Sequence, residues 1–337
     1  MRSLAALLML FIAACAPRLQ PLEPANATPI LGGDRMTMDD GAELPLRVWA
    51  PTGSPRAAFL ALHGFNDYSL SFEEPAKHWA AAGIVTYAFD QRGFGDTAYR
   101  GLWPGEVRMI EDLRIAAALI RQRHAGIPLY LVGESMGGAV IMAAATSGDP
   151  PAAAGLILAA PAIWGRDAQG PVKSGALWLF AHTMPWLTLT GEGLKVQPSD
   201  NLEMLRRLAR DPKVIKETRV DAIWGLTNMM DLAYDAAPRL PAPALLLYGS
   251  QEDVLPDDAV LAMLRRLPTE ADRRPRVALY AAGYHMLLRD LSAAVVLDDI
   301  IAWVADRSAP LPSGGDVRAE AAMTGGGDSL ATSAVTD

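Results

Sequence analysis

The sequence predicts an α/β protein whose central sheet is mainly parallel and covered by helices on both faces. Short apolar runs, typical of buried strands, alternate with long helical stretches, as expected of parallel strands joined by crossover helices. One interval of about 80 residues, 161–241, breaks this alternation and predicts an inserted, mostly helical cap. The 337 residues are 51% hydrophobic, which is enough for one large core with such an insertion.

The N-terminus has the pattern of a signal peptide. Arg2 precedes an apolar run, ending at Ala14, that is too short to cross a bilayer as a helix. The run leads into Cys15, the single cysteine of the chain, in a context that resembles the bacterial lipobox. We therefore expect residues 1–14 to be a lipoprotein-type signal peptide and Cys15 to carry a lipid anchor. Ordinary secretory cleavage after Ala16 is the alternative.

The resemblance to lipoproteins implies a place in the bacterial cell envelope. Ala16 stands where lipoproteins retained in the inner membrane commonly have aspartate. We therefore expect the chain to be anchored in the outer membrane, on its periplasmic face.

Composition sets the predicted boundaries of the remaining segments. Residues 15–34 are rich in Pro, Ala and Asn without an apolar period, which predicts a flexible tether. The folded core is predicted over 35–160 and 242–306, on either side of the cap at 161–241. Residues 307–337 are rich in Pro, Gly, Ser and Ala, and we expect a disordered tail there.

The core is predicted to begin with a hairpin. The turn residues Asp39, Asp40 and Gly41 separate two short runs at 35–38 and 44–49. The buried-strand candidates that follow are 57–62, 84–89, 129–132, 155–160, 244–248 and 277–280, and the helical stretches include 106–124 and 135–146.

The cap interval is unusually rich in large apolar side chains: Trp164, Trp178, Leu179, Phe180, Met184, Trp186, Leu187, Trp224, Met229 and Met230. Each of them taken singly is most simply explained by packing in the cap's own core. Together they predict that an apolar substrate channel lies between the cap and the strand ends.

The charge of the chain bears on its partners. A formal net charge of −8 and a sequence pI near 5.2 give no basic field to hold a nucleic-acid backbone, so we expect no nucleic-acid partner. The interspersed charges indicate a solvated surface, and they identify no protein partner.

A nucleophile motif lies between a predicted strand and a predicted helix. The sequence G-E-S-M-G-G at 133–138 contains G-x-S-x-G in the strand-turn-helix context that this motif requires. The glycines allow a strained turn, and the following helix directs free N–H groups at developing negative charge. We therefore expect Ser135 to be the nucleophile.

A serine hydroxyl needs an imidazole to take its proton. In folds with this motif the order along the chain is nucleophile, acid, histidine, so the histidine comes late. His285 follows the last strand candidate and is the expected general base. The other histidines are His63, His78, His124 and His182.

The acid is expected in the loop after the strand at 244–248. Glu252 and Asp253 compete there, since either carboxylate can orient an imidazole. An upstream strand ends at His63-Gly64-Phe65, which matches the segment that supplies one oxyanion-hole N–H, and the residue after the nucleophile supplies the other. These residues are Phe65 and Met136, and we expect His63 to hold the loop.

The motifs at 63–66, 90–95, 133–138, 249–256 and 284–286 resemble the monoacylglycerol lipase and lysophospholipase branch of the α/β-hydrolases, which is also classified with S33-type serine aminopeptidases. The resemblance covers residues 35–305 and implies an α/β-hydrolase fold with an inserted helical cap. Such hydrolases commonly have Gly-x-x-Asp-x-x-x-Pro after the strand. Counting from Gly249 to Pro256 favours Glu252 as the acid, with Asp253 as second choice.

The resemblance implies a serine esterase that needs no cofactor or metal. The apolar cap and the expected anchor favour monoacyl lipid esters, such as a lysophospholipid or a monoacylglycerol. Two alternatives remain: a catalytically silent lipid-binding protein, and an aminopeptidase that holds an α-amino group with cap carboxylates such as Glu192, Glu203 and Asp221. Arg92, in the segment 90–95, is expected to tie loops together beneath the site.

Overall fold

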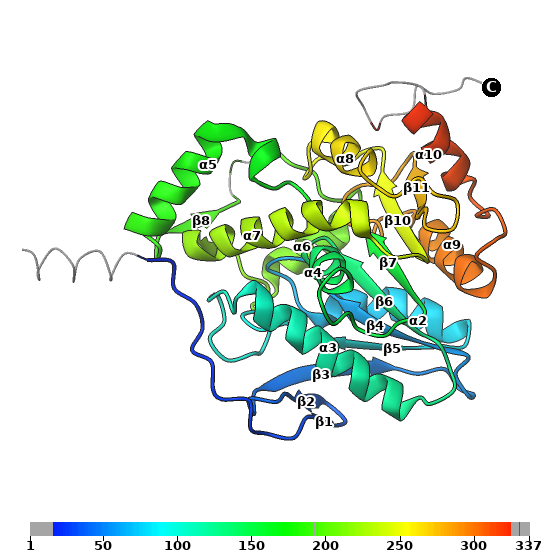
Figure 1. Ribbon diagram of the computed structural model, residues 1–337, viewed down its shortest axis with the longest axis horizontal. Helices are drawn as coiled ribbons and strands as arrows, with labels where there is room; N and C mark the ends of the chain where they lie inside the picture. The colour runs from blue at the N-terminus through cyan, green and yellow to red at the C-terminus, as the bar shows by residue number, and fades with distance from the viewer. Residues whose placement is uncertain (1–15, 192, 194, 325–329, 331–337) are drawn as a thin grey trace, which may run out of the picture.

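The fold is described by a computed structural model for residues 16–191, 193, 195–324 and 330 (Figure 1). The expected signal peptide and Cys15 lie outside these described residues. No helix in the described part is long and apolar enough to cross a bilayer.

The strands are β1 Ile30–Leu31, β2 Arg35–Thr37, β3 Glu43–Trp49, β4 Ala57–Leu62, β5 Ile84–Phe89, β6 Leu129–Glu134, β7 Gly155–Ala159, β8 Thr188–Thr190, β9 Glu217–Arg219, β10 Ala244–Gly249 and β11 Arg276–Tyr280. The α-helices are α2 Glu73–Ala81, α3 Glu106–Arg123, α4 Met136–Ala145, α5 Arg166–Thr183, α6 Leu202–Arg210, α7 Val220–Ala236, α8 Asp257–Leu264, α9 Ala293–Ala305 and α10 Gly315–Thr324.

Over the described residues, the main sheet has nine strands in the order β1-β2-β3-β5-β4-β6-β7-β10-β11. The strands from β5 to β11 in this order run parallel, and β3, β2 and β1 extend the sheet by antiparallel pairing. The predicted hairpin is confirmed, because β2 and β3 pair antiparallel with Thr37 opposite Glu43. β4 and β5 are buried along their whole length, as expected of strands covered on both faces.

Helices bury both faces of the sheet. On one face α3, α4 and α8 contribute residues such as Leu113, Val140 and Val260 to the larger core. On the other face α2 and α9 contribute Trp79 and Ile300 to a second cluster. This double cover confirms the predicted fold class. It leaves the carboxyl ends of the parallel strands as the edge at which loops can form a site.

The chain between β7 and β10 forms the cap, which contains α5, β8, α6, β9 and α7. α7 lies against α4, and α5 packs on α7 at the outside of the molecule (Figure 1). Met229 is fully buried, whereas Trp178, Phe180 and Trp186 are exposed. For these three residues, which lie on α5 and in the turn after it, the expectation that they pack in the cap's own core is wrong, because their side chains are exposed.

Part of the segment 15–34, expected to be a flexible tether, is ordered against the core. Gln20 is buried and its backbone N–H donates to the carbonyl of Trp103 at 2.9 Å. Farther along, β1 pairs with β2. The polar composition hid this order, because it comes from backbone bonds to distant loops.

The segment 307–337, expected to be a disordered tail, contains α10. This helix packs on the edge strand β11, with Ala319 fully buried. Arg318 Nε donates to the carbonyl oxygen of Leu279 at 2.9 Å, so the helix also satisfies a backbone group of that edge. The expectation of disorder is wrong for α10, because the sheet edge supplies a partner that composition does not reveal.

Candidate active site

Ser135 lies at the turn between β6 and α4. Its backbone adopts φ 52° and ψ −116°, a conformation that is strained for a residue with a side chain. Gly137, two residues later, packs directly on the backbone of β4. A Cβ at position 137 would lie 2.0 Å from the carbonyl oxygen of Leu62. Glycine is therefore required at 137. The strained turn leaves the Ser135 hydroxyl at the start of α4, where the helix amides have no intrahelical partner.

His285 lies in the loop between β11 and α9 and faces the serine. Its Nε2 is 3.0 Å from Ser135 Oγ, and its Nδ1 is 2.8 Å from Glu252 Oε2. A carboxylate can only accept, so Nδ1 carries the proton and Nε2 presents a lone pair to the hydroxyl. The two hydrogen bonds form the arrangement needed to deprotonate a serine.

Glu252, in the loop after β10, is the carboxylate that contacts His285. Its side chain is fully buried, and its other oxygen, Oε1, accepts from the backbone N–H groups of Val254 and Leu255 at 2.8 and 3.0 Å. Asp253 instead accepts from the backbone N–H of Gln197 at 2.7 Å. Of the two candidates in the sequence, the structure brings Glu252 to the imidazole.

The electrostatics of the pair suit a general base. Burial by itself would lower the pKa of His285, but the adjacent Glu252 carboxylate and the nearby Glu134 carboxylate together outweigh it and raise that pKa above 6.5. Burial opposes ionisation of Glu252, yet the imidazole and two backbone N–H groups hold the pKa of this carboxyl below its usual value. The carboxylate therefore stays ionised and stabilises the imidazolium that forms when the serine loses its proton.

The expected oxyanion loop lies beside the nucleophile. A Cβ on Gly64 would be 3.4 Å from the Cβ of Ser135, so the loop passes close to the nucleophile at Gly64. Phe65 is the next residue of this loop. The Phe65 ring packs edge-on against Phe94 with centroids 5.6 Å apart. Met136 is the first residue of α4. The two expected donors thus flank Ser135, from two segments far apart in sequence.

Cap residues hold the same loop. Asn66, with φ 64°, donates from Nδ2 to Thr218 Oγ1 at 2.6 Å and accepts from the backbone N–H of Ile215 at 2.9 Å. Tyr68 donates its hydroxyl to Asp211 Oδ2 at 2.7 Å. The position of the oxyanion loop therefore depends on the cap.

A buried arginine that sequence reasoning missed joins the three loops of the site. Arg289 donates to Asp67 Oδ2 and to Glu134 Oε2, both at 2.8 Å. Asp67 belongs to the oxyanion loop, Glu134 precedes the nucleophile, and Arg289 follows His285 by four residues. No local pattern marks this network, because its members become neighbours only when the sheet forms.

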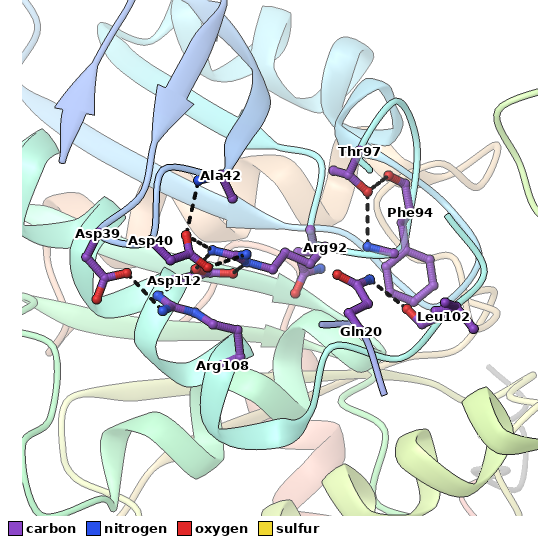
Figure 2. Close-up of polar contacts among 12 residues, drawn as sticks. Gln20, Asp39, Asp40, Ala42, Arg92, Phe94, Thr97, Leu102, Arg108 and Asp112 are labelled. Atoms are coloured by element: carbon purple, nitrogen blue, oxygen red, sulfur yellow. Dashed lines mark hydrogen bonds and ion pairs between the residues drawn. The ribbon is translucent and has the colours of Figure 1, made fainter. Parts of the chain in front are cut away.

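Arg92 has the structural role that the sequence predicts. Its guanidinium binds Asp40 at 2.7 Å and Asp112 at 2.7 Å, and Arg108 bridges Asp112 to Asp39, both at 2.8 Å (Figure 2). These ion pairs join the hairpin turn to the loop after β5 and to α3. Because the network is buried, losing one partner would leave an uncompensated charge.

The remaining histidines are occupied elsewhere. His63 is buried, with Nδ1 2.8 Å from the carbonyl oxygen of Gly64 and Nε2 accepting from the backbone N–H of Gln91 at 3.0 Å, so it holds the oxyanion loop. His78 pairs with Asp298, His124 with Tyr87, and His182 with the carbonyl of Trp178.

Carboxylates and histidines form no metal site in the described residues. No group of three or more His, Cys, Asp or Glu side chains there is arranged to hold a metal ion. Of the cap carboxylates considered for an aminopeptidase, Asp221 binds Arg219, Glu203 lies exposed on α6, and Glu192 falls outside the described residues.

The strand order, the strained turn that carries Ser135 and the helix behind it define an α/β-hydrolase fold. The chain belongs to the family described as serine aminopeptidase, S33, which matches residues 53–292.

Curated relatives align with most of the chain. A monoacylglycerol lipase from Mycolicibacterium smegmatis is 24% identical over 279 residues, which are 78% of this chain and 93% of that protein. The human monoglyceride lipase is 27% identical over 287 residues, covering 80% of this chain and 89% of the relative.

Solved structures show the same fold. A soluble variant of monoglyceride lipase from Saccharomyces cerevisiae, crystallised with a substrate analogue, superposes with a TM-score of 0.66 at 20% identity. It covers 87% of this chain and 98% of its own. The Paleococcus ferrophilus monoacylglycerol lipase gives a TM-score of 0.60 at 20% identity, with 79% and 100% covered.

Proposed function

We propose that the chain is a serine hydrolase that cleaves carboxylic esters, with monoacyl lipid esters such as monoacylglycerols or lysophospholipids as substrates. The observation that carries the proposal is the pair of hydrogen bonds from Ser135 to His285 and from His285 to Glu252, 3.0 and 2.8 Å long. The relatives named monoacylglycerol lipase and monoglyceride lipase support the substrate class.

The reaction is acyl transfer to water. Ser135 attacks the ester carbonyl while His285 takes its proton, and the Phe65 and Met136 N–H groups stabilise the oxyanion. The imidazolium then protonates the leaving alcohol, which departs and leaves an acyl-enzyme on Ser135. Water, deprotonated by His285, attacks the acyl group, and the collapse of the second tetrahedral intermediate releases the fatty acid and restores the serine.

The N-terminal sequence supports a lipid anchor as part of the same proposal. An anchor on Cys15 would hold the enzyme in the bacterial cell envelope, at the periplasmic face of the outer membrane. There its substrates are products of phospholipid and acylglycerol breakdown within the same bilayer.

A fluorophosphonate probe tests the reaction class. We expect the parent protein to be labelled and to hydrolyse monoacylglycerol or lysophosphatidylcholine, and the Ser135→Ala variant to lose both. A folded parent that is not labelled would refute the enzyme and support the lipid-binding alternative. Cleavage of a prolyl-anilide, but not of the lipid esters, would indicate an aminopeptidase.

Mass spectrometry of the mature chain tests the anchor separately. A diacylglyceryl group on an N-terminal Cys15 is the expected result. A chain that begins at Pro17 without lipid would contradict the anchor and leave the esterase proposal untouched.

A further inference from the structure

A short segment of the cap lies against the loop between β11 and α9, the loop that carries the general base. This segment is residues 197–201, between β8 and α6, and we name it the cap clamp. The carbonyl oxygen of Pro198 accepts from the backbone N–H of Met286 at 2.9 Å, and Asp200 Oδ1 accepts from the backbone N–H of Leu291 at 2.8 Å. The clamp therefore binds this histidine loop at two backbone positions.

A buried pair of side chains adds a third contact. Ser199 is fully buried and donates its hydroxyl to Asp290 Oδ1 at 2.6 Å. The other carboxyl oxygen of Asp290, Oδ2, accepts from the backbone N–H of Tyr284 at 2.7 Å. Because Tyr284 immediately precedes His285, two consecutive hydrogen bonds join the backbone of the general base to the cap.

Asn201 fixes the other end of the clamp. Its Oδ1 accepts from the backbone N–H of Met204 at 3.1 Å and so caps the start of α6. Its backbone N–H donates to Ser199 Oγ at 3.1 Å, and its Nδ2 donates to the carbonyl oxygen of Arg289 at 3.0 Å. One residue therefore ties the first turn of α6 to the histidine loop.

The loop after β10, which carries Glu252, contacts both the clamp and the histidine loop. The backbone N–H of Gln197 donates to Asp253 Oδ2 at 2.7 Å. The backbone N–H of Gln251 donates to the carbonyl oxygen of Gly283 at 2.9 Å. The cap clamp is therefore bonded to both loops that carry the histidine and its carboxylate.

We infer that Ser199 and Asp290 are positioning residues for the reaction. Through the backbone N–H of Tyr284 they hold His285 within hydrogen-bond distance of Ser135. The inference rests on the proposed function, because it concerns the imidazole that takes the serine proton. The distance from Nε2 to Oγ is 3.0 Å, so a loop that moves away by about 1 Å loses this hydrogen bond. A displacement of about that size can lower the rate of a reaction about 100-fold.

The test compares Ser199→Ala, Asp290→Ala and Asp290→Asn with the parent protein. Ser199→Ala removes the side-chain contact with the cap, and Asp290→Ala also leaves the N–H of Tyr284 without its acceptor. Asp290→Asn is the conservative rescue, because its amide oxygen still accepts from that N–H and its NH2 group can donate to Ser199 Oγ. Ser174→Ala is the matched control, since this cap hydroxyl donates to the carbonyl oxygen of Arg166, at the start of α5.

The first readout is steady-state hydrolysis of a soluble short-chain ester, with thermal unfolding to show that each variant is folded. We expect kcat to fall about tenfold in Ser199→Ala and about 100-fold in Asp290→Ala, because the proton transfer is misaligned. KM should change less than about twofold, since ester binding is left intact. Asp290→Asn and Ser174→Ala should keep kcat within about threefold. Adding Ser199→Ala to Asp290→Ala should cost less than about twofold more, because Ser199 acts through Asp290.

The second readout is proton NMR, which a merely structural role would not change in a folded variant. The Nδ1 proton of His285, hydrogen-bonded to Glu252, should resonate far downfield in the parent. The resonance should stay in place in Asp290→Asn and Ser174→Ala. In Asp290→Ala it should move upfield or disappear, because the imidazole is no longer held against the carboxylate.

Four outcomes decide the matter. Folded Ser199→Ala and Asp290→Ala variants with parental kcat and an unmoved resonance would overturn the inference and leave the esterase proposal intact. Equal losses in Asp290→Asn and Asp290→Ala would also overturn it, because the bond to Tyr284 would then not be what matters. If Asp290→Ala does not fold, Ser199→Ala set against Asp290→Asn gives the same decision from both readouts. A parent that neither cleaves the ester nor reacts with the fluorophosphonate probe would refute the proposed function, and the inference with it.

Discussion

Replacing Glu252 with glutamine tests how the imidazole is oriented. The Oε1 position lies between the N–H groups of Val254 and Leu255, at 2.8 and 3.0 Å, so it must remain an acceptor. The glutamine NH2 group is then forced to the Oε2 position, 2.8 Å from His285 Nδ1. There it donates to Nδ1, which puts the ring proton on Nε2, facing the serine. In this tautomer His285 cannot accept the serine proton.

The two backbone donors determine how far kcat should fall in the Glu252→Gln variant. Turning the amide round would leave both N–H groups without an acceptor, at about 1–3 kcal/mol each, so the active orientation is held by fewer than about one molecule in thirty. Loss of the negative charge that stabilises the imidazolium adds to this. We expect kcat to fall about 10³- to 10⁴-fold, as wrong-tautomer variants of catalytic triads do.

The assay is steady-state hydrolysis of a monoacylglycerol, with thermal unfolding to show that the variant is folded. Asp253→Asn is the matched control, because this neighbouring carboxylate is exposed and accepts only from the backbone of Gln197. It should keep activity within about twofold. A folded Glu252→Gln variant with nearly full activity, or an Asp253→Asn variant that loses it, would show that Glu252 does not orient the imidazole.

Three further predictions concern pH and stability. Glu134 helps to raise the pKa of His285, so Glu134→Gln should lower that pKa and move the acid limb of kcat/KM to lower pH. Burial raises the pKa of Asp290 from 3.8 to about 6 in the folded protein. The folded state therefore favours the protonated carboxyl, and the protein loses free energy of unfolding as pH rises from 3.8 to about 6. Asp290→Asn cannot ionise and should raise Tm by about 2 °C at pH 7.5, with no gain at pH 4. A chain that ends at Ser313 loses α10 and should be less stable to urea by about 2–4 kcal/mol.

A specific result would contradict each of these three predictions. An acid limb that stays in place or moves upward in Glu134→Gln would show that this carboxylate does not act on the imidazole. An equal Tm change in Asp290→Asn at both pH values would indicate a packing effect. If removal of α10 leaves the free energy of unfolding in urea unchanged, the helix does not support β11. The control is Val317→Gln on the exposed side of α10, which should change that free energy by less than about 0.5 kcal/mol.

The parallel sheet was predictable because its signals are local. β4 and β5 have the residues that the apolar runs predict, since a strand buried on both faces must be apolar throughout. The turn at Ser135 was predictable for a similar reason. Its glycines mark backbone that tolerates no side chain, and the strand and helix on either side are visible in the same stretch of sequence.

The failures at the two ends of the chain have the opposite cause. α10 and the segment around Gln20 are ordered by distant partners, namely the edge of β11 and the carbonyls of Leu102 and Trp103. Composition measures only whether a segment can bury its own apolar groups. It does not report an unpaired sheet edge elsewhere in the chain.

The order of nucleophile, acid loop and histidine can be predicted from the sequence alone, because these motifs lie at strand ends whose apolar runs are evident. Tertiary contacts show which of two adjacent carboxylates faces His285, and that Arg289 joins Asp67 to Glu134. The structure also places Trp178 and Trp186 on the outside of the cap. Side-chain direction in a loop, and the partner of a helix face, are set by contacts between residues far apart in sequence, which no local pattern encodes.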